Sequence, residues 1–209
     1  KPEATAAAIK QLCLEAKTYH LLGVCINPCY VSLAKSILAG TPVKIVTVVG
    51  FPLGADISAV KALAAAEAVK AGADEIDMVL NVGALQEGCL EAVTADIAAV
   101  VKAAAPKPVK VIIETCLLTD AEKVTACRMI AEAVAAFVKT STGFNKGGAT
   151  VADVKLLAAA AGKLHLQVKA AGGIRDAAAA RAMLAAGAER LGTSAGVAIS
   201  QAEAPGSKA

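Results

Sequence analysis

Apolar residues along the chain fall into short β-branched runs that alternate with longer stretches rich in alanine and leucine. Seven runs have the length and composition of strands: residues 22–26, 43–49, 75–80, 109–114, 137–140, 164–169 and 190–193. The stretches between them have the length and the Ala, Leu, Lys and Glu content of helices. Strands that alternate with helices indicate right-handed βαβ units and therefore a parallel sheet.

Glycines and threonines mark where the expected helices end and begin. Gly72 and Gly187 each follow a helical stretch and precede a strand, which is the position of a left-handed C-terminal cap. The equivalent place before residue 137 holds Val134, and a β-branched residue there predicts either a strained backbone or another kind of cap. Thr119 and Thr150 each stand three residues before an acidic residue, as in a capping box, so we assign them to structure.

The fold that fits this pattern is an α/β fold, a (β/α)8 TIM barrel. The 209 residues suffice for a single barrel domain spanning residues 1–209, although such barrels usually run to about 250 residues. Seven strands are one fewer than a closed barrel needs, so the first strand would lie upstream of residue 1. A doubly wound open sheet could also hold seven strands. No Gly-x-Gly-x-x-Gly turn follows the early strands, which counts against a dinucleotide-binding sheet.

Composition argues against several classes of protein. Hydrophobic residues make up 56% of the chain, which disfavours disorder, yet no uninterrupted apolar run is long enough to span a membrane. The net charge of +3 is spread along the chain, and two Tyr and three Phe offer little for stacking on bases, so we expect no nucleic-acid partner. The six cysteines form no CxxC pair, and we interpret them as reduced thiols of a cytoplasmic protein. The two histidines have no second ligand at metal-binding spacing, so we expect no metal and no cofactor.

Charged residues at the ends of three expected strands are the candidates for catalysis. Lys139 and Lys169 end neighbouring strands, where the active site of a parallel barrel forms. Repulsion between two such ammonium groups would lower the pKa of a lysine toward neutrality, and a neutral amine is what attack on a carbonyl requires. Asp77, on a third strand, could move protons through a water, or could be a structural counter-ion that keeps Lys169 charged. Each lysine alone could equally form a structural ion pair.

Glycine-rich turns follow the last two strands. Gly172 and Gly173 come shortly after Lys169, and Gly192 and Ser194 end the last strand. Loops at this position of a barrel often bind phosphate on backbone N–H groups, and Gly143 in the loop after Lys139 could contribute. Each glycine pair is more often a tight turn, but together they favour a phosphorylated substrate.

At these residues the chain resembles the deoxyribose-phosphate aldolase family, in its short prokaryotic form. The segments that carry the resemblance are Val24-Cys25-Ile26-Asn27-Pro28, Val48-Val49-Gly50-Phe51-Pro52-Leu53-Gly54, Glu75-Ile76-Asp77-Met78-Val79, Ile112-Ile113-Glu114-Thr115, Phe137-Val138-Lys139-Thr140-Ser141-Thr142-Gly143-Phe144, Val168-Lys169-Ala170-Ala171-Gly172-Gly173 and Leu191-Gly192-Thr193-Ser194. They span nearly the whole chain in the expected order.

The resemblance implies a class I aldolase that reversibly cleaves 2-deoxy-D-ribose 5-phosphate to D-glyceraldehyde 3-phosphate and acetaldehyde. It implies that Lys139 forms the Schiff base, that Lys169 perturbs the pKa of Lys139, and that Asp77 moves protons with a water. The remaining residues that it places at the substrate and its phosphate are Cys25, Thr140, Gly143, Gly172, Gly173, Gly192 and Ser194. It also implies a homo-oligomer, either a dimer or a tetramer, whose partners are small phosphosugars and aldehydes.

Two other functions fit the barrel less well. Another phosphosugar enzyme, such as an isomerase or an aldolase with a different donor, would share the phosphate loops without requiring both lysines. A non-catalytic barrel that binds a sugar phosphate would have no reason to keep a low-pKa amine beside Asp77.

Overall fold

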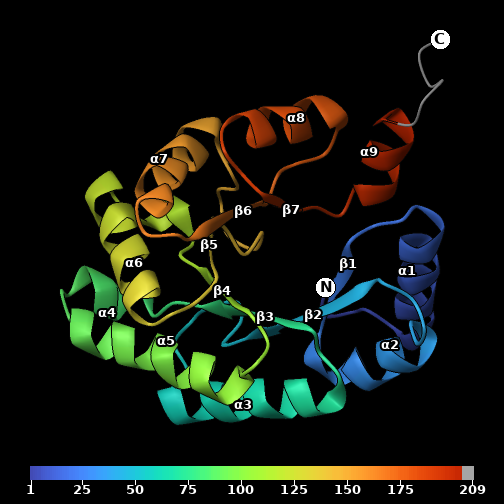
Figure 1. Ribbon diagram of the computed structural model, residues 1–209, viewed down its shortest axis with the longest axis horizontal. Coiled ribbons are helices and arrows are strands. Elements are labelled where there is room, and N and C mark those ends of the chain that lie inside the picture. The colour runs from blue at the N-terminus through green and yellow to red at the C-terminus, as the bar shows by residue number, and fades with distance from the viewer. Residues whose placement is uncertain (204–209) are drawn as a thin grey trace.

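In the computed structural model, which describes residues 1–203, seven parallel strands form one sheet in the order β1-β2-β3-β4-β5-β6-β7. The strands are β1 (Gly23–Ile26), β2 (Lys44–Val49), β3 (Glu75–Val79), β4 (Val109–Ile112), β5 (Phe137–Lys139), β6 (Gln167–Ala171) and β7 (Arg190–Gly192). The sheet curls into a half-barrel, with β1 and β7 at its two edges (Figure 1). The prediction of a TIM-barrel-like α/β fold is therefore confirmed.

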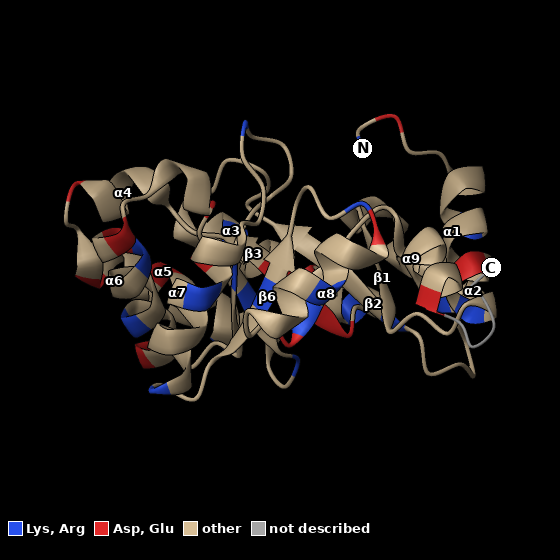
Figure 2. Cartoon of the chain, turned by 90° about the horizontal axis from the view of Figure 1, so that it is seen from above, with Lys and Arg blue, Asp and Glu red and all other residues tan. Residues whose placement is uncertain are grey.

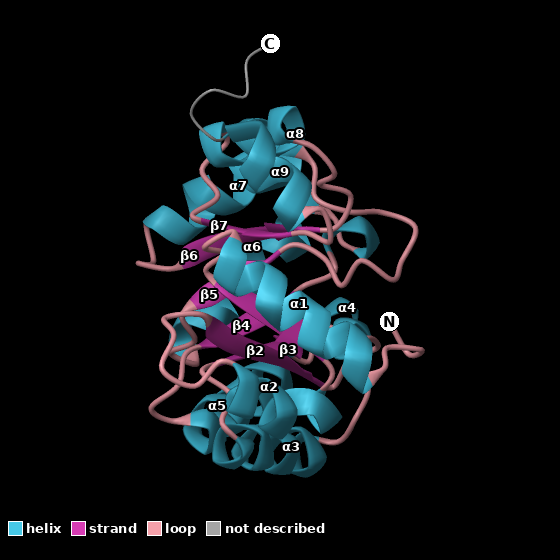
Figure 3. Cartoon of the chain, turned by 90° about the vertical axis from the view of Figure 1, so that its right-hand side faces the viewer, coloured by secondary structure: helices cyan, strands magenta, loops and turns pink. Residues whose placement is uncertain are grey.

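Helices cover the outside of the curled sheet, because each crossover between parallel strands must return along the same side. They are α1 (Ala6–Thr18), α2 (Val31–Ile37), α3 (Ser58–Ala71), α4 (Val82–Gln86), α5 (Leu90–Ala104), α6 (Asp120–Glu132), α7 (Val151–Gly162), α8 (Ala177–Ala185) and α9 (Gly196–Glu203), with short 3-10 turns at Pro28–Tyr30 and Thr115–Leu117. Figure 3 shows the strands in the middle of the molecule with helices beyond them on both sides.

The helical layer bridges the two edges of the sheet. Ser200 and Gln201 of α9 donate hydrogen bonds to the backbone carbonyl and the hydroxyl of Tyr19, which follows α1. A Cβ on Gly196, at the start of α9, would lie 3.3 Å from Cδ1 of Leu21, so the two segments are close here as well. The C-terminal helix is thereby attached to the first helix, and the two edge strands are held in one curved body.

Most local predictions hold, and one strand is displaced. Gly72 and Gly187 have φ values of 113° and 108°, and Thr119 forms a full capping box with Glu122. Val134 has a φ of 60°, so the strain predicted for a valine at this turn is present. Strand β6 begins at Gln167 instead of residue 164, because Leu164 and Leu166 donate their N–H groups to Ala161 and wrap the end of α7.

Basic and acidic residues are dispersed over many elements of the described chain, as Figure 2 shows. Among residues 1–203, no helix combines the length and the apolar character that crossing a membrane requires.

Candidate active site

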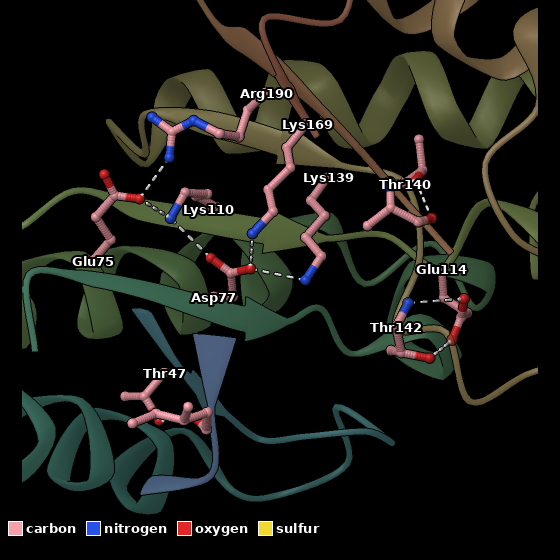
Figure 4. Close-up of polar contacts among 12 residues, drawn as sticks. Thr47, Glu75, Asp77, Lys110, Glu114, Lys139, Thr140, Thr142, Lys169 and Arg190 are labelled. Carbon is pink, nitrogen blue, oxygen red and sulfur yellow. Dashed lines mark hydrogen bonds and ion pairs between the residues drawn. The ribbon is translucent and has the colours of Figure 1, made fainter. Parts of the chain in front are cut away.

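The carboxylate of Asp77 is the centre of a cluster of lysines inside the half-barrel (Figure 4). Its Oδ1 accepts a hydrogen bond from Lys110 Nζ at 2.9 Å. Its Oδ2 accepts one from Lys139 Nζ at 2.8 Å and a second from Lys169 Nζ at 2.6 Å. The structure therefore brings together the three residues that the sequence nominated for catalysis, and it adds a fourth.

The strand register explains why these side chains meet. Asp77 on β3 pairs with Lys110 on β4, and Lys139 on β5 pairs with Lys169 on β6. Register partners on neighbouring parallel strands point to the same face of the sheet, which here is the concave face. Asp77 is fully buried, and Lys139 and Lys169 are each 5% exposed, so little water competes for these contacts.

The electrostatics of the cluster favour an ionised Asp77. Burial opposes its ionisation, but the charges of Lys139, Lys169 and Lys110 outweigh burial and hold the pKa of the carboxyl well below its usual range. Asp77 therefore accepts hydrogen bonds from the lysines as a carboxylate at neutral pH.

The two lysines of the pair respond in opposite directions. Burial lowers the pKa of Lys139, but the Asp77 carboxylate outweighs burial, so the pKa of Lys139 lies above its ordinary value. For Lys169, burial together with the charges of Lys139 and Lys110 outweighs Asp77, and its pKa is lowered. The sequence predicted a lowered pKa within the pair, and it falls on Lys169. Lys169 is thus the amine that most readily becomes neutral in the resting protein.

A chain of ion pairs lies beneath the cluster, and the sequence analysis did not identify it. Lys110 Nζ lies 2.6 Å from Glu75 Oε2, and the same oxygen lies 2.9 Å from Arg190 Nη1. Both cations lie near the ring of Phe137, whose centroid is 5.8 Å from Lys110 Nζ and 5.3 Å from Arg190 Cζ. A lysine inside a β-branched strand was the available signal, because a buried cation requires a carboxylate partner.

Cys25 faces the same interior from β1. It stands between the buried residues Val24 and Ile26, so its side chain points to the other face of the strand. Part of the Cys25 residue is exposed to solvent, while the charges of Asp77, Lys139 and Lys169 act on its thiol. Desolvation is the main reason that the pKa of its thiol is raised, and Asp77 adds to this effect. The thiol form therefore predominates at neutral pH.

The Thr140 hydroxyl is both a donor and an acceptor in a structural contact with Ala171. The hydroxyl donates to the carbonyl of Ala171 at 3.0 Å and accepts from the N–H of Ala171, also at 3.0 Å. It ties the end of β5 to the end of β6 and is completely buried. A direct contact of Thr140 with substrate stays a prediction.

The glycines that the sequence nominated lie in loops that meet at one end of the sheet. Gly143, Gly172 and Gly173 have φ values of 83°, 90° and 79°, a region that side chains rarely adopt. A Cβ on Gly172 would lie 3.1 Å from the Cα of Gly148 and 3.7 Å from the Cα of Gly143, so the loops after β5 and β6 are in close contact. The backbones of these two loops approach each other at positions where a side chain would leave no room.

The loop after β7 joins this group. A Cβ on Gly192 would lie 3.2 Å from Cε of Lys169, so this glycine leaves room for the lysine. The Thr193 hydroxyl donates to the carbonyl of Ile174 at 2.6 Å, which fastens the loop to the one after β6. Ser194 is exposed between this anchor and the first turn of α9.

Glu114 organises the loop after β5, and the sequence analysis gave it no role. It is buried, with a φ of 45°, and its carboxylate accepts from the Thr142 hydroxyl at 2.5 Å and from the Thr142 N–H at 3.3 Å. Phe144 in the same loop packs edge to face on Phe51, with ring centroids 5.3 Å apart. The position of Gly143 is therefore fixed from both sides.

Within residues 1–203, no three His, Cys, Asp or Glu side chains gather in a way that could hold a metal ion. The site contains a pair of amines that share one carboxylate oxygen, next to a group of glycine-rich loops. Such a pair can form and break a Schiff base with a carbonyl, and can move a proton beside it.

Comparisons with known proteins agree with this geometry. Residues 2–202 match the model of the DeoC/LacD family of aldolases. A deoxyribose-phosphate aldolase of Streptococcus pneumoniae is 56% identical over 203 residues, which cover 97% of this chain and 92% of the relative. One from Streptococcus equi subsp. zooepidemicus is 54% identical over the same shares.

Solved structures share the fold over most of their length. A putative deoxyribose-phosphate aldolase from Coccidioides immitis superposes with a TM-score of 0.95 at 43% identity, over 96% of this chain and 80% of that one. A deoxyribose phosphate aldolase from Aeropyrum pernix, described as tetrameric, superposes with a TM-score of 0.91 at 33% identity, over 97% of this chain and 86% of that one.

Proposed function

The chain belongs to the DeoC/LacD family of aldolases, and on that premise we propose that it acts through a Schiff base on Lys139. Its activity is that of a deoxyribose-phosphate aldolase, a lyase. The reaction is the reversible cleavage of 2-deoxy-D-ribose 5-phosphate to D-glyceraldehyde 3-phosphate and acetaldehyde. The observation that carries the mechanism is the convergence of two lysine amines on Asp77 Oδ2.

The first step needs a neutral Lys139. Lys169, whose pKa is lowered, has the more readily available neutral amine and takes the proton of the Lys139 ammonium group; because the pKa of Lys139 is raised, this transfer is uphill until attack on the carbonyl consumes the neutral Lys139 amine. Both amines contact the same carboxylate oxygen, so the transfer needs little movement. The neutral Lys139 amine then attacks C1 of the open-chain sugar, and loss of water leaves an iminium ion.

The iminium ion is the electron sink for cleavage. The C2–C3 bond breaks as the C3 hydroxyl gives its proton to a water held by Asp77, which releases D-glyceraldehyde 3-phosphate and leaves an enamine on Lys139. Asp77 lies within hydrogen-bond distance of that nitrogen and, with a water, returns a proton to C2. Hydrolysis of the resulting imine frees acetaldehyde and restores the lysine.

The glycine-rich loops supply the phosphate site in this proposal. Gly143, Gly172 and Gly173 have left-handed conformations in the loops after β5 and β6, and Gly192 and Ser194 precede the first turn of α9. Backbone N–H groups near a helix N-terminus suit a phosphate dianion. Cys25 lines the interior from the opposite edge of the sheet, near the reacting carbons.

Assembly and location complete the proposal. We infer a homo-oligomer, either a dimer or a tetramer, since the Aeropyrum pernix relative is described as tetrameric. We also infer a cytoplasmic, single-domain enzyme that needs no cofactor. Light scattering coupled to size-exclusion chromatography measures the assembly directly, and a monomer at micromolar concentration would refute it.

Trapping of the imine tests the central claim. The protein is incubated with acetaldehyde and reduced with borohydride, and the modified peptide is mapped by mass spectrometry. A two-carbon adduct is expected on Lys139 and lost in Lys139→Met. Lys123→Met is the matched control, because Lys123 is also buried and contacts two carboxylates, those of Asp120 and Asp153.

The outcomes of trapping are distinct. An adduct on Lys169 would exchange the roles of the two lysines. A folded wild-type protein that shows no adduct would refute the Schiff-base mechanism.

A further inference from the structure

Lys110 is the most deeply buried cation of the site. Its side chain is wholly inaccessible to solvent, and its Nζ lies between Glu75 Oε2 at 2.6 Å and Asp77 Oδ1 at 2.9 Å. Figure 4 shows it pointing toward Asp77 from the side opposite Lys139. Because a buried cation is costly, a lysine here must do something that an apolar residue could not do.

The effect of Lys110 is visible in how the oxygens of Asp77 are shared. A carboxylate has two oxygens with about four acceptor positions, so two amines can bind different oxygens or share one. Here Lys110 occupies Oδ1, and Lys139 and Lys169 both bond to Oδ2. The two amine nitrogens therefore lie no farther apart than the sum of their distances to that oxygen.

We propose that Lys110 is a positioning residue: by occupying one oxygen of Asp77, it forces the amines of Lys139 and Lys169 to converge on the other. The consequence for catalysis rests on the proposed function, because it assumes that the pair forms a Schiff base. The effect on the geometry and titration of the pair does not depend on that assumption.

The surroundings prevent Lys110 from withdrawing. Glu75 binds it from β3, and Arg190 from β7 binds the same Glu75 oxygen at 2.9 Å. The ring of Phe137 lies against both cations. Lys110 Nζ, which solvent does not reach, is thus held between Glu75 and Asp77.

Charged groups from several strands surround Lys139 and Lys169, so the position of Lys110 affects the pKa values of this pair. Asp77 and Glu75 come from β3, Lys110 from β4, Arg190 from β7 and Cys25 from β1. Glu114, which follows β4, raises the pKa of Lys139. The charges of Lys110 and Lys139 both lower the pKa of Lys169, and the second effect depends on how closely the two amines approach.

Replacing Lys110 with Met keeps an unbranched side chain, one atom shorter, and removes its charge. Asp77 is then free to turn and give one oxygen to each amine, which separates them. Loss of the Lys110 charge and separation of the amines both raise the pKa of Lys169. The neutral fraction of Lys169 at pH 7 therefore falls, and kcat/KM is expected to fall about 10- to 100-fold at pH 7. The deficit is expected to shrink steadily as the pH is raised toward 10.

Two measurements test the proposal on the full chain. The first is the pH profile of kcat/KM for deoxyribose 5-phosphate cleavage in wild type, Lys110→Met and the control Lys123→Met. The second is an NMR titration of protein labelled at lysine Cε, with Lys169→Met used to assign the low-pKa resonance. The titration reports on the pair whether or not the protein is an aldolase.

If Lys110→Met does not fold, the double variant Lys110→Met/Glu75→Gln replaces it, because it removes the buried charge of Glu75, which Arg190 alone would then have to balance. Support for the proposal is an upward shift of the Lys169 titration, with an activity deficit that high pH relieves, and no shift in Lys123→Met. An unchanged titration in the folded variant, or a deficit equal at every pH, would overturn it. A wild type whose Lys169 titrates low but which cleaves no sugar would contradict only the proposed function.

Discussion

Asp77→Asn is the substitution that separates catalysis from charge balance in this site. In the native protein three ammonium groups bind the Asp77 carboxylate, at 2.9, 2.8 and 2.6 Å, and Asp77 itself is fully buried. An amide has one acceptor oxygen and presents an NH2 group to a lysine, so at least one buried cation loses its partner. Breaking a buried ion pair in this way costs about 3–5 kcal/mol.

For a chain of this size, that cost corresponds to a fall in Tm of about 6–20 °C. The pKa of Asp77 is lowered in the folded protein, so the stability it contributes is fully present above its unfolded pKa and is lost as the pH falls through the folded value. The difference in unfolding free energy between wild type and variant is therefore complete at pH 7 and narrows below about pH 4.

The assay pairs thermal unfolding with kcat/KM for deoxyribose 5-phosphate. Proton transfer by a positioned carboxylate is worth about 10²- to 10⁴-fold, and a loss in that range is expected. Asp96→Asn is the matched control, because Asp96 is a buried carboxylate paired with Lys61 at 2.6 Å between α3 and α5. It should lose stability and keep its activity. If Asp77→Asn is destabilised but retains kcat/KM within about threefold of wild type, Asp77 is only a counter-ion.

Three further predictions concern the loops and helix ends. Glu114→Gln weakens the hydrogen bonds to Thr142, so KM for the sugar phosphate is expected to rise about three- to tenfold, with a smaller change in kcat. KM for unphosphorylated 2-deoxyribose should stay constant. Equal changes in KM for both sugars would argue against a phosphate site in this loop. Val134→Gly relieves an exposed valine at φ 60° and should raise stability by about 1 kcal/mol in urea unfolding, and a decrease would show that the strain is not released. Thr119→Ala removes a capping box and should lower Tm by about 2–4 °C, with kcat unchanged.

The sequence specified the local structure well. Alternating β-branched and alanine-rich segments predicted all seven strands of the described sheet, and Gly72, Gly187 and Thr119 marked helix ends correctly. These features depend on contacts within a few residues, so a linear pattern contains them. The start of β6 was wrong because Leu164 and Leu166 are held by α7, a contact that overrides their strand propensity.

The sequence also nominated Asp77, Lys139 and Lys169, because charged residues at strand ends are conspicuous among apolar neighbours. Their proximity, and the close approach of the loops that hold Gly143 and Gly172, are visible only in the structure. The sequence pattern alone showed which strands end in candidate catalytic residues. It did not show which side chains bind which oxygen.

Tertiary structure alone decided the electrostatics of the site. Lys110, Glu75 and Arg190 come from three strands, and only strand register and the curvature of the sheet bring the two cations to the Glu75 carboxylate. Whether Lys139 or Lys169 has the lowered pKa depends on burial and on distances to charges far away in sequence. The sequence determined the kinds of groups and their order along the chain. The ionisation of these groups depends on how charges are arranged around them in the folded protein, because charge–charge energies depend on separation in space and on the surrounding dielectric.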